Sequence, residues 1–183
     1  MVVVIFMMKI SRIIEFDISK ELHQQITELR NSCFPKNPKP RSYYKQLPHF
    51  RYLVFVEDTL VAHMGVDHRV IRVGDSIFTI FGLIDLCVEG SYRQQGIASQ
   101  LLSSLTTLAR EKSIDFLFVV VKDNRIYSQN GFYNISNYCS WLRIHEHYNF
   151  GVAVEKIQDE FMIKQIGDRQ WLDEPIDLLG YMF

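Results

Sequence analysis

One stretch, residues 83–132, constrains the fold more than any other part of the chain. It contains an apolar run from Leu83 to Val88, a turn with a single glycine, a segment with apolar residues at helical spacing, and a second apolar run from Phe116 to Val121. A short helix that closes near Gly131 is expected next. This order predicts a βαβ unit, whose turn directs several backbone N–H groups above the end of the first strand.

The turn from Arg93 to Ala98 has the chemistry of an anion site. The first N–H groups of a helix have no partner within the helix and carry the positive end of its dipole, so they favour a ligand such as a pyrophosphate. Gly96 would allow a close approach because it has no Cβ, and Arg93 would add a permanent positive charge. A plain connection between strand and helix is the alternative that this turn leaves open.

Two other phosphate sites are excluded by spacing. The chain contains no Gly-Lys pair, which a P-loop requires. A dinucleotide fingerprint needs two further glycines at fixed positions around Gly96, and they are absent.

Two motifs in this order resemble the GCN5-related N-acetyltransferase (GNAT) family. The segment Val88 to Leu102 resembles the acetyl-CoA signature, which reads Arg or Gln, two residues, Gly, any residue, and Gly or Ala. The segment Tyr127 to Phe132 resembles a later motif, in which an aromatic acid precedes a Gly-Phe pair by four residues. The match covers residues 50–135 well and the ends less well. It implies a mixed α/β (α+β) fold with an antiparallel meander, then the βαβ unit, and a splayed sheet flanked by helices.

The resemblance also implies acetyl-CoA as co-substrate, without a metal. In this family the third meander strand splays from the next parallel strand, so that backbone groups near its end are free to bond the pantetheine arm. Ser99 would reach a phosphate oxygen or cap the helix, and the sequence leaves both roles open. The residues assigned to acetyl-CoA are Leu86, Cys87, Val88, Arg93, Gln94, Gln95, Gly96, Ile97, Ala98 and Ser99.

Acetyl transfer to an amine needs a neutral nitrogen, a donor for the oxyanion, an acid for the leaving thiolate and close positioning. The resemblance assigns the acid to Tyr127, with tyrosine packing as the alternative, and the oxyanion donor to a backbone N–H near Val88. Cys87 is interpreted as a small buried hydrophobe and not as a nucleophile, because direct transfer in a ternary complex needs no covalent intermediate.

The general base is the weak point of the resemblance. Many relatives carry a Glu on the third meander strand, where this chain has Gly82 and Ile84. Asp85 is the only carboxylate on that strand, and strand alternation directs it to the face opposite Ile84 unless a bulge turns it inward. His63 and His68 are further candidates, and proton transfer through water is another route.

Composition fits a single domain over residues 1–183, with 48% hydrophobic and 22% charged residues. A net charge of −1 without a dense Lys or Arg run argues against nucleic-acid binding. Three cysteines without metal-ligand spacing predict a reduced, cytoplasmic protein. The apolar start is too short for a membrane span, and residues 1–7 are of uncertain origin, since Met7 or Met8 could be the first residue.

Outside the central stretch, the pattern predicts further elements. A helix carrying Leu22, Ile26, Leu29 and Cys33 is expected after a cap at Asp17 or Ser19, and three prolines then begin a loop that lies over the acceptor site or simply connects. The tail, residues 168–183, is expected to dock. The predicted strands are Lys9–Phe16, Phe50–Glu57, Leu60–Val73, Ser76–Val88, Cys139–His145 and Phe161–Ile166, with a charged excursion at Glu155–Glu160.

Together these features predict transfer of acetyl from acetyl-CoA to a primary amine of a small, polyamine-like or aminoglycoside-like molecule. Alternatives are a longer acyl donor, a protein amine, or a catalytically silent acyl-CoA-binding module; the missing strand Glu favours the silent module and Tyr127 opposes it. A homodimer is left open. The tail, through Asp173, Glu174, Asp177 and the carboxylate of Phe183, either attracts a cationic amine or forms a solvated turn with an apolar plug.

Overall fold

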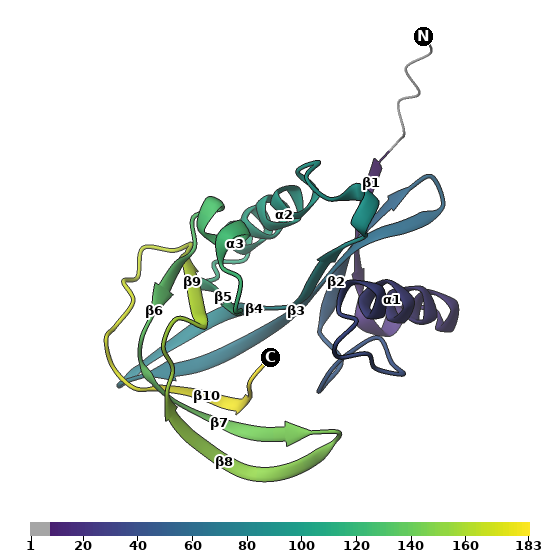
Figure 1. Cartoon of the computed structure of the whole chain (residues 1–183). Helices are drawn as coiled ribbons and strands as arrows, with labels where there is room; N and C mark the ends of the chain where they lie inside the picture. The colour runs from purple at the N-terminus through teal and green to yellow at the C-terminus, as the bar shows by residue number, and fades with distance from the viewer. Residues whose placement is uncertain (1–7) are drawn as a thin grey trace. The chain divides into compact units, whose positions relative to one another are not determined.

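The computed structural model describes residues 8–183, and its mixed α/β architecture confirms the predicted fold class (Figure 1). The expectations about residues 1–7 lie outside the described part. The chain divides into two compact units, of which unit 1 comprises residues up to Val66 together with Asp85–Leu101, and unit 2 comprises Asp67–Ile84 together with Leu102–Phe183. Strands β3 and β4 and helix α2 each contribute residues to both units.

Unit 1 is built on an antiparallel sheet covered by one helix. Its elements are β1 (Met8–Ile14), a 3-10 turn (Glu15–Asp17), α1 (Lys20–Cys33), β2 (Phe50–Val56), the first part of β3 (Thr59–Val73), the end of β4 (Ser76–Val88), a second 3-10 turn (Gly90–Tyr92) and the start of α2 (Ile97–Glu111). Strand β2 pairs antiparallel with both β1 and β3. Figure 1 shows α1 beside β2.

Helix α1 follows the predicted pattern. Of the two candidate caps, Ser19 is the one used, because its Oγ accepts from the Leu22 N–H at 3.2 Å. Ile26 and Leu29 are buried in a core that also contains Cys87 of β4. The helix ends at Cys33, two residues before Pro35, whose ring cannot continue it.

Unit 2 contains strands β5 to β10 together with the other parts of β3 and β4, and these strands follow the order β6-β9-β5-β4-β3-β10-β7-β8. The predicted βαβ pairing is present, since β4 and β5 are parallel from Ile80 opposite Phe116 to Leu83 opposite Val119. Figure 1 shows β7 and β8 as a long hairpin with β10 beside β7. The elements beyond α2 are β5 (Phe116–Val120), α3 (Arg125–Gln129), β6 (Tyr133–Ile135), β7 (Tyr138–His145), β8 (Tyr148–Lys156), β9 (Phe161–Gln165) and β10 (Ile176–Tyr181).

The structure has three strands that the sequence pattern did not predict. Strand β8 overlaps the expected charged excursion at Glu155–Glu160 only at its last two residues, and it pairs antiparallel with β7. Its apolar side chains alternate along the strand and are exposed, and the sequence prediction missed this alternation. Strand β6 is only three residues long, and the tail forms β10, which pairs with β3 and β7.

Among residues 8–183, no helix combines the length and the apolar character that crossing a bilayer requires. In the same residues, no three His, Cys, Asp or Glu side chains are grouped so that they could hold a metal ion.

Candidate functional site

The glycine turn before α2 has an open, left-handed backbone. Gln94 and Gly96 have φ angles of 60° and 78°, and a Cβ added to Gly96 would meet no atom within 4 Å. The first helical hydrogen bond runs from the Gln100 N–H to the Gly96 carbonyl at 3.0 Å. The N–H groups of the first turn come before Gln100, the first residue that donates to a carbonyl of the helix, so they point out of its N-terminal end. The surface above Gly96 has room for a phosphate group.

Arg93 is anchored to the strand end that precedes the turn. Its Nε donates to the Val88 carbonyl at 2.9 Å, while its side chain is exposed. The neighbouring Glu89 N–H donates to the Val61 carbonyl at 2.8 Å, which attaches the strand end to β3. The guanidinium has five N–H donors, so one bond to Val88 fixes its position and leaves others to face an anion.

Asp85, the carboxylate proposed as a base, has a left-handed backbone with φ 47° within β4. This conformation interrupts the alternation of side chains along a regular strand. Its carboxylate accepts from the buried Arg30 guanidinium at 2.5 Å, and its carbonyl accepts from His63 Nδ1 at 3.1 Å. Asp85 is thus oriented by polar groups of α1 and β3.

His63 is buried with both ring nitrogens engaged. Its Nε2 lies 2.9 Å from Nη1 of Arg51, and a guanidinium can only donate, so Nε2 accepts and Nδ1 carries the proton given to the Asp85 carbonyl. Burial first and the charge of Arg51 second hold the pKa of His63 well below 6.5. The neutral ring is therefore a structural part of this unit.

Arg51 is the centre of a buried polar network. It is 1% exposed, and its Nε and Nη2 donate to the Glu15 carboxylate at 2.6 and 2.7 Å. Its Nη1 also donates to the Ser42 carbonyl at 2.8 Å, and the Ser42 hydroxyl lies 2.8 Å from His23 Nδ1. The network thus fastens the loop after α1 to the sheet.

A cavity of about 370 Å³ lies between α1 and that loop. Its lining is polar on the helix side, through His23, Gln24 and Thr27, and it continues along the segment Pro40–Tyr43 and Leu47. This volume falls in the range of small-molecule sites. The loop after α1 therefore borders a cavity of small-molecule size. The sequence analysis left open whether this loop lies over the acceptor site or is only a connector.

Tyr127 belongs to unit 2, where α3 holds it. The residue is 6% exposed, and its ring packs edge-to-face on Phe132 with centroids 5.4 Å apart. The Tyr127 carbonyl accepts from the N–H groups of Asn130 and Phe132, at 2.9 and 3.1 Å. The second motif is therefore one tight turn in which the aromatic pair fixes the tyrosine ring.

The C-terminal segment covers Gly82, one of the two positions at which the family resemblance led us to look for a Glu. The ring of Phe183 lies so close that a Cβ at Gly82 would be 2.8 Å from it. Arg69 holds the segment by donating to the Tyr181 carbonyl at 2.6 Å and by facing the Phe183 ring at 5.2 Å. The Tyr181 hydroxyl donates to the buried Asp67 at 2.7 Å. Glycine at position 82 is thus required by the packing of Phe183.

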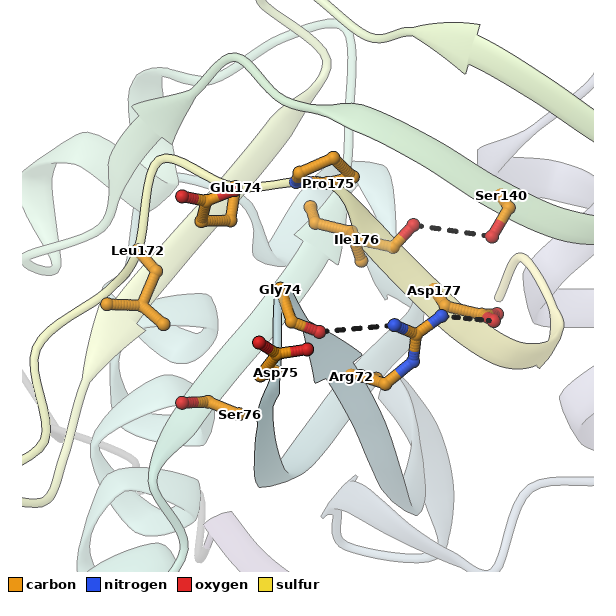
Figure 2. Close-up of a pocket in the computed structure, with 10 residues that line it drawn as sticks. All are labelled: Arg72, Gly74, Asp75, Ser76, Ser140, Leu172, Glu174, Pro175, Ile176 and Asp177. Atoms are coloured by element: carbon orange, nitrogen blue, oxygen red, sulfur yellow. Dashed lines mark hydrogen bonds and ion pairs between the residues drawn. The ribbon is translucent and has the colours of Figure 1, made fainter.

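A second cavity, with a volume of about 520 Å³, lies in unit 2, and Figure 2 shows the residues that line it. Two of the acidic tail residues predicted to attract an amine, Glu174 and Asp177, line it together with Asp75, whereas Asp173 is not among the lining residues. Arg72 reaches Asp177 at 3.5 Å and neutralises part of the acidic charge. This cavity borders the turn before β4. The role of the tail in binding the acceptor amine stays a prediction.

One family model identifies the family to which this chain belongs. A model described as an acetyltransferase (GNAT) domain matches residues 17–135, which is more than half of the chain. The chain belongs to the GNAT family. Both GNAT motifs read from the sequence lie inside the matched residues.

Solved structures share the GNAT fold with this chain at low identity. The GNAT family N-acetyltransferase YhbS from Escherichia coli in complex with CoA is 13% identical and has a TM-score of 0.63 over 94% of this chain and 90% of that chain. A GNAT family acetyltransferase from Brucella melitensis in complex with acetyl-CoA is 10% identical, with a TM-score of 0.60 over 93% and 95%.

The matches also include a longer protein. A probable N-acyltransferase from Enterococcus faecalis V583 is 12% identical, with a TM-score of 0.56 over 69% of this chain, and this chain spans only 32% of its length. No curated protein sequence matches the chain.

Within this GNAT fold, unit 1 contains all ten residues that the sequence analysis assigned to acetyl-CoA. Leu86–Val88 and the turn from Arg93 to Ser99 all belong to it, as does Asp85, whereas Tyr127 is described in unit 2. Sequence reasoning missed Arg30 and Arg51. The signal for Arg51 was a single charge inside the apolar run of β2, which calls for a buried partner.

Proposed function

We propose that this chain transfers acetyl from acetyl-CoA to a primary amine of a small molecule by direct attack in a ternary complex. The turn at Gly96 carries the proposal, because it offers an open left-handed backbone at the start of α2, beside the permanent charge of Arg93. Membership of the GNAT family supports acetyl transfer. The CoA and acetyl-CoA complexes of two structural neighbours support the donor.

Donor binding is assigned to unit 1. The N–H groups from Gly96 to Ser99 and the Arg93 guanidinium would bind the pyrophosphate, and the side chains of Gln94 and Gln95 are exposed beside them. The backbone of Leu86, Cys87 and Val88 would bond the pantetheine arm. The Val88 carbonyl already accepts from Arg93, and the backbone N–H of Val88 is the group proposed to stabilise the oxyanion.

Proton transfers are assigned to Tyr127 and Asp85. As the amine nitrogen bonds to the acetyl carbon and the carbon–sulfur bond breaks, Tyr127 would give its phenolic proton to the leaving thiolate. Asp85 would take the proton that the acceptor ammonium must lose before its nitrogen, then neutral, can attack. Arg30 contacts only Oδ2 of that carboxylate in the bond given above, so Oδ1 is the oxygen proposed to act.

Replacing Tyr127 by Phe should lower kcat about a hundredfold, the lower end for one proton donor, while acetyl-CoA affinity stays within about twofold. Phenylalanine keeps the ring contact with Phe132 and removes only the hydroxyl. Steady-state rates and calorimetric titration of both proteins check this. Equal rates would remove Tyr127 from the mechanism.

The Asp85→Asn variant distinguishes two roles of Asp85: a general base for the amine, or only the partner of Arg30 in an ion pair. If Asp85 deprotonates the amine, the activity lost in this variant recovers as the pH approaches the pKa of the acceptor, because the amine then needs no base. A loss that is equal at every pH would assign Asp85 only to holding Arg30.

The acceptor amine is proposed to bind in the cavity between α1 and the loop that follows it. The cavity has the volume of a small-molecule site, and the loop that lines it is the one that the family resemblance places over the acceptor. Thr27→Trp would fill it and should raise the acceptor KM at least about tenfold with unchanged acetyl-CoA affinity, as expected for lost binding alone. Gln25→Trp is the matched control, since Gln25 lies on the same helix and lines a different hollow. Equal effects of both substitutions would contradict this assignment.

Calorimetric titration with acetyl-CoA, followed by a screen of polyamines and aminoglycosides, tests the function as a whole. One-site binding with turnover of an amine supports transfer. Binding without turnover of small amines, peptide amines or longer acyl donors would favour the second candidate, a silent acyl-CoA-binding module. Two observations favour that candidate: Phe183 covers Gly82, and Arg30 pairs with Asp85.

A further inference from the structure

The three cysteines of the chain lie in different surroundings. Cys33 is the last residue of α1 and is half-buried, whereas Cys87 is buried near the end of β4, in the core on which Cys33 packs. Cys139 is buried in unit 2. Cys33 and Cys87 therefore form a pair, while Cys139 provides an internal comparison.

Cys33 packs against the core that contains Cys87, and its sulfur lies beside the carbonyl of Val88, the residue that follows Cys87. The Cys33 thiol donates to the Val88 carbonyl at 3.4 Å when it is protonated. A hydrogen bond from the Cys87 thiol lowers the pKa of Cys33 to about 6, against the effect of burial and with help from Arg93 and Ser32. The same contact, together with burial, raises the pKa of Cys87 well above 9. At neutral pH the pair is thus one accessible thiolate beside one buried thiol.

This asymmetry is what a thiol oxidation site requires. A thiolate is the nucleophile toward peroxides and must be reached by them, while a neighbouring thiol must be close enough to resolve the product. Cys139 has neither property, because burial raises its pKa to about 12. The reactivity of the chain is therefore concentrated at the end of α1.

We propose that Cys33 and Cys87 are a modification site at which hydrogen peroxide forms an intramolecular disulfide. The Cys33 thiolate attacks one peroxide oxygen, the oxygen–oxygen bond breaks, and hydroxide leaves, so that the sulfur is oxidised to a sulfenic acid. The sulfur of Cys87 then attacks the Cys33 sulfur, the Cys87 proton goes to the departing hydroxyl, and water leaves as the disulfide forms.

The disulfide would act on the end of β4. It moves the Cys33 sulfur, which lies 3.4 Å from the Val88 carbonyl oxygen, and it ties Cys87 to α1 immediately before the segment that leads to Arg93. Insofar as the proposed function holds, oxidation should weaken acetyl-CoA binding roughly three- to tenfold, the effect of losing one backbone hydrogen bond between the end of β4 and the pantetheine arm. Dithiothreitol should restore the affinity.

The test treats the reduced full-length chain with hydrogen peroxide, blocks remaining thiols with N-ethylmaleimide under denaturing conditions, and measures intact and peptide masses. We expect one maleimide per chain, on Cys139, and a linked peptide pair containing Cys33 and Cys87. Cys33→Ser should retain two blocked thiols. Cys87→Ala should instead give a Cys33 sulfenic acid that dimedone traps, and Cys139→Ser should form the disulfide like the parent.

Three blocked thiols after peroxide treatment, or a disulfide that includes Cys139 or joins two chains, would overturn the proposal. Acetyl-CoA titration of the reduced and oxidised proteins is a separate readout. If the reduced chain does not bind acetyl-CoA, the proposed function fails while the mass result still decides the disulfide. If the reduced chain binds and the oxidised chain binds equally well, the effect on the donor segment is contradicted.

Discussion

Replacing Gly96 by Val should abolish measurable acetyl-CoA binding, with an expected loss of about a thousandfold in affinity. Gly96 has a φ of 78°, which a β-branched residue rarely adopts, and the added side chain would enter the open space above the turn. Losing two charge-assisted hydrogen bonds to phosphate, at about 2 kcal/mol each, corresponds to this factor. Isothermal titration of parent and variant gives the two dissociation constants.

Substitutions at two other glycines serve as controls that distinguish weaker acetyl-CoA binding from backbone strain alone. Gly151, in β8, has nearly the same φ, 81°, and open space around its Cβ position, so Gly151→Val should cost similar stability without weakening acetyl-CoA. Gly90→Ala adds a methyl group beside the same loop, where nothing lies within 4 Å. If Gly96→Val binds acetyl-CoA within about threefold of the parent, the turn is only a connection and the proposed function falls.

Arg51→Met should lower the free energy of unfolding by about 3–5 kcal/mol, the usual cost of removing one partner from a buried ion pair. The substitution leaves the Glu15 carboxylate buried without its two guanidinium donors, and it removes the donors to Ser42 and to His63. Urea unfolding followed by far-ultraviolet circular dichroism measures the change. Circular dichroism is needed because both tryptophans lie in unit 2, whereas Arg51 lies in unit 1.

An exposed ion pair is the matched control. Arg72 pairs with Asp177 at 3.5 Å with half of its side chain exposed, so Arg72→Met should cost less than about 1 kcal/mol. Adding Glu15→Gln to Arg51→Met should recover part of the loss, because a neutral amide is less costly to bury than a carboxylate. An Arg51→Met variant within about 1 kcal/mol of the parent would contradict the assigned role of the network.

Local patterns predicted much of the fold. The apolar stripe of α2 is buried, with Leu101, Leu102 and Leu105 fully covered, and the turn at Gly96 adopts the left-handed backbone for which glycine is suited. The meander strands β2, β3 and β4 agree with the prediction to within a residue at each end. These features depend on neighbouring residues in the chain, which is why periodicity and turn chemistry identify them.

Long-range features escaped prediction. Arg30 reaches Asp85 across 55 positions of sequence, and the Phe183 ring packs on Gly82 across a longer separation still. No spacing rule connects such residues, since tertiary packing alone brings them together. The left-handed backbone at Asp85 is of this kind as well: the sequence indicated that a bulge would be needed, but a strand-like run gives no sign of where one occurs.

The fixed tautomer of His63 decides which group sets the pH response of any reaction at this site. Its imidazole accepts from one side and donates from the other, so taking up a second proton would set two cations, the ring and Arg51, against each other inside the core. His63 therefore adds no titration step between pH 6 and 8. A rate that rises with pH near neutrality would therefore reflect a group other than His63, and the buried imidazole keeps an unchanging charge beside Arg51.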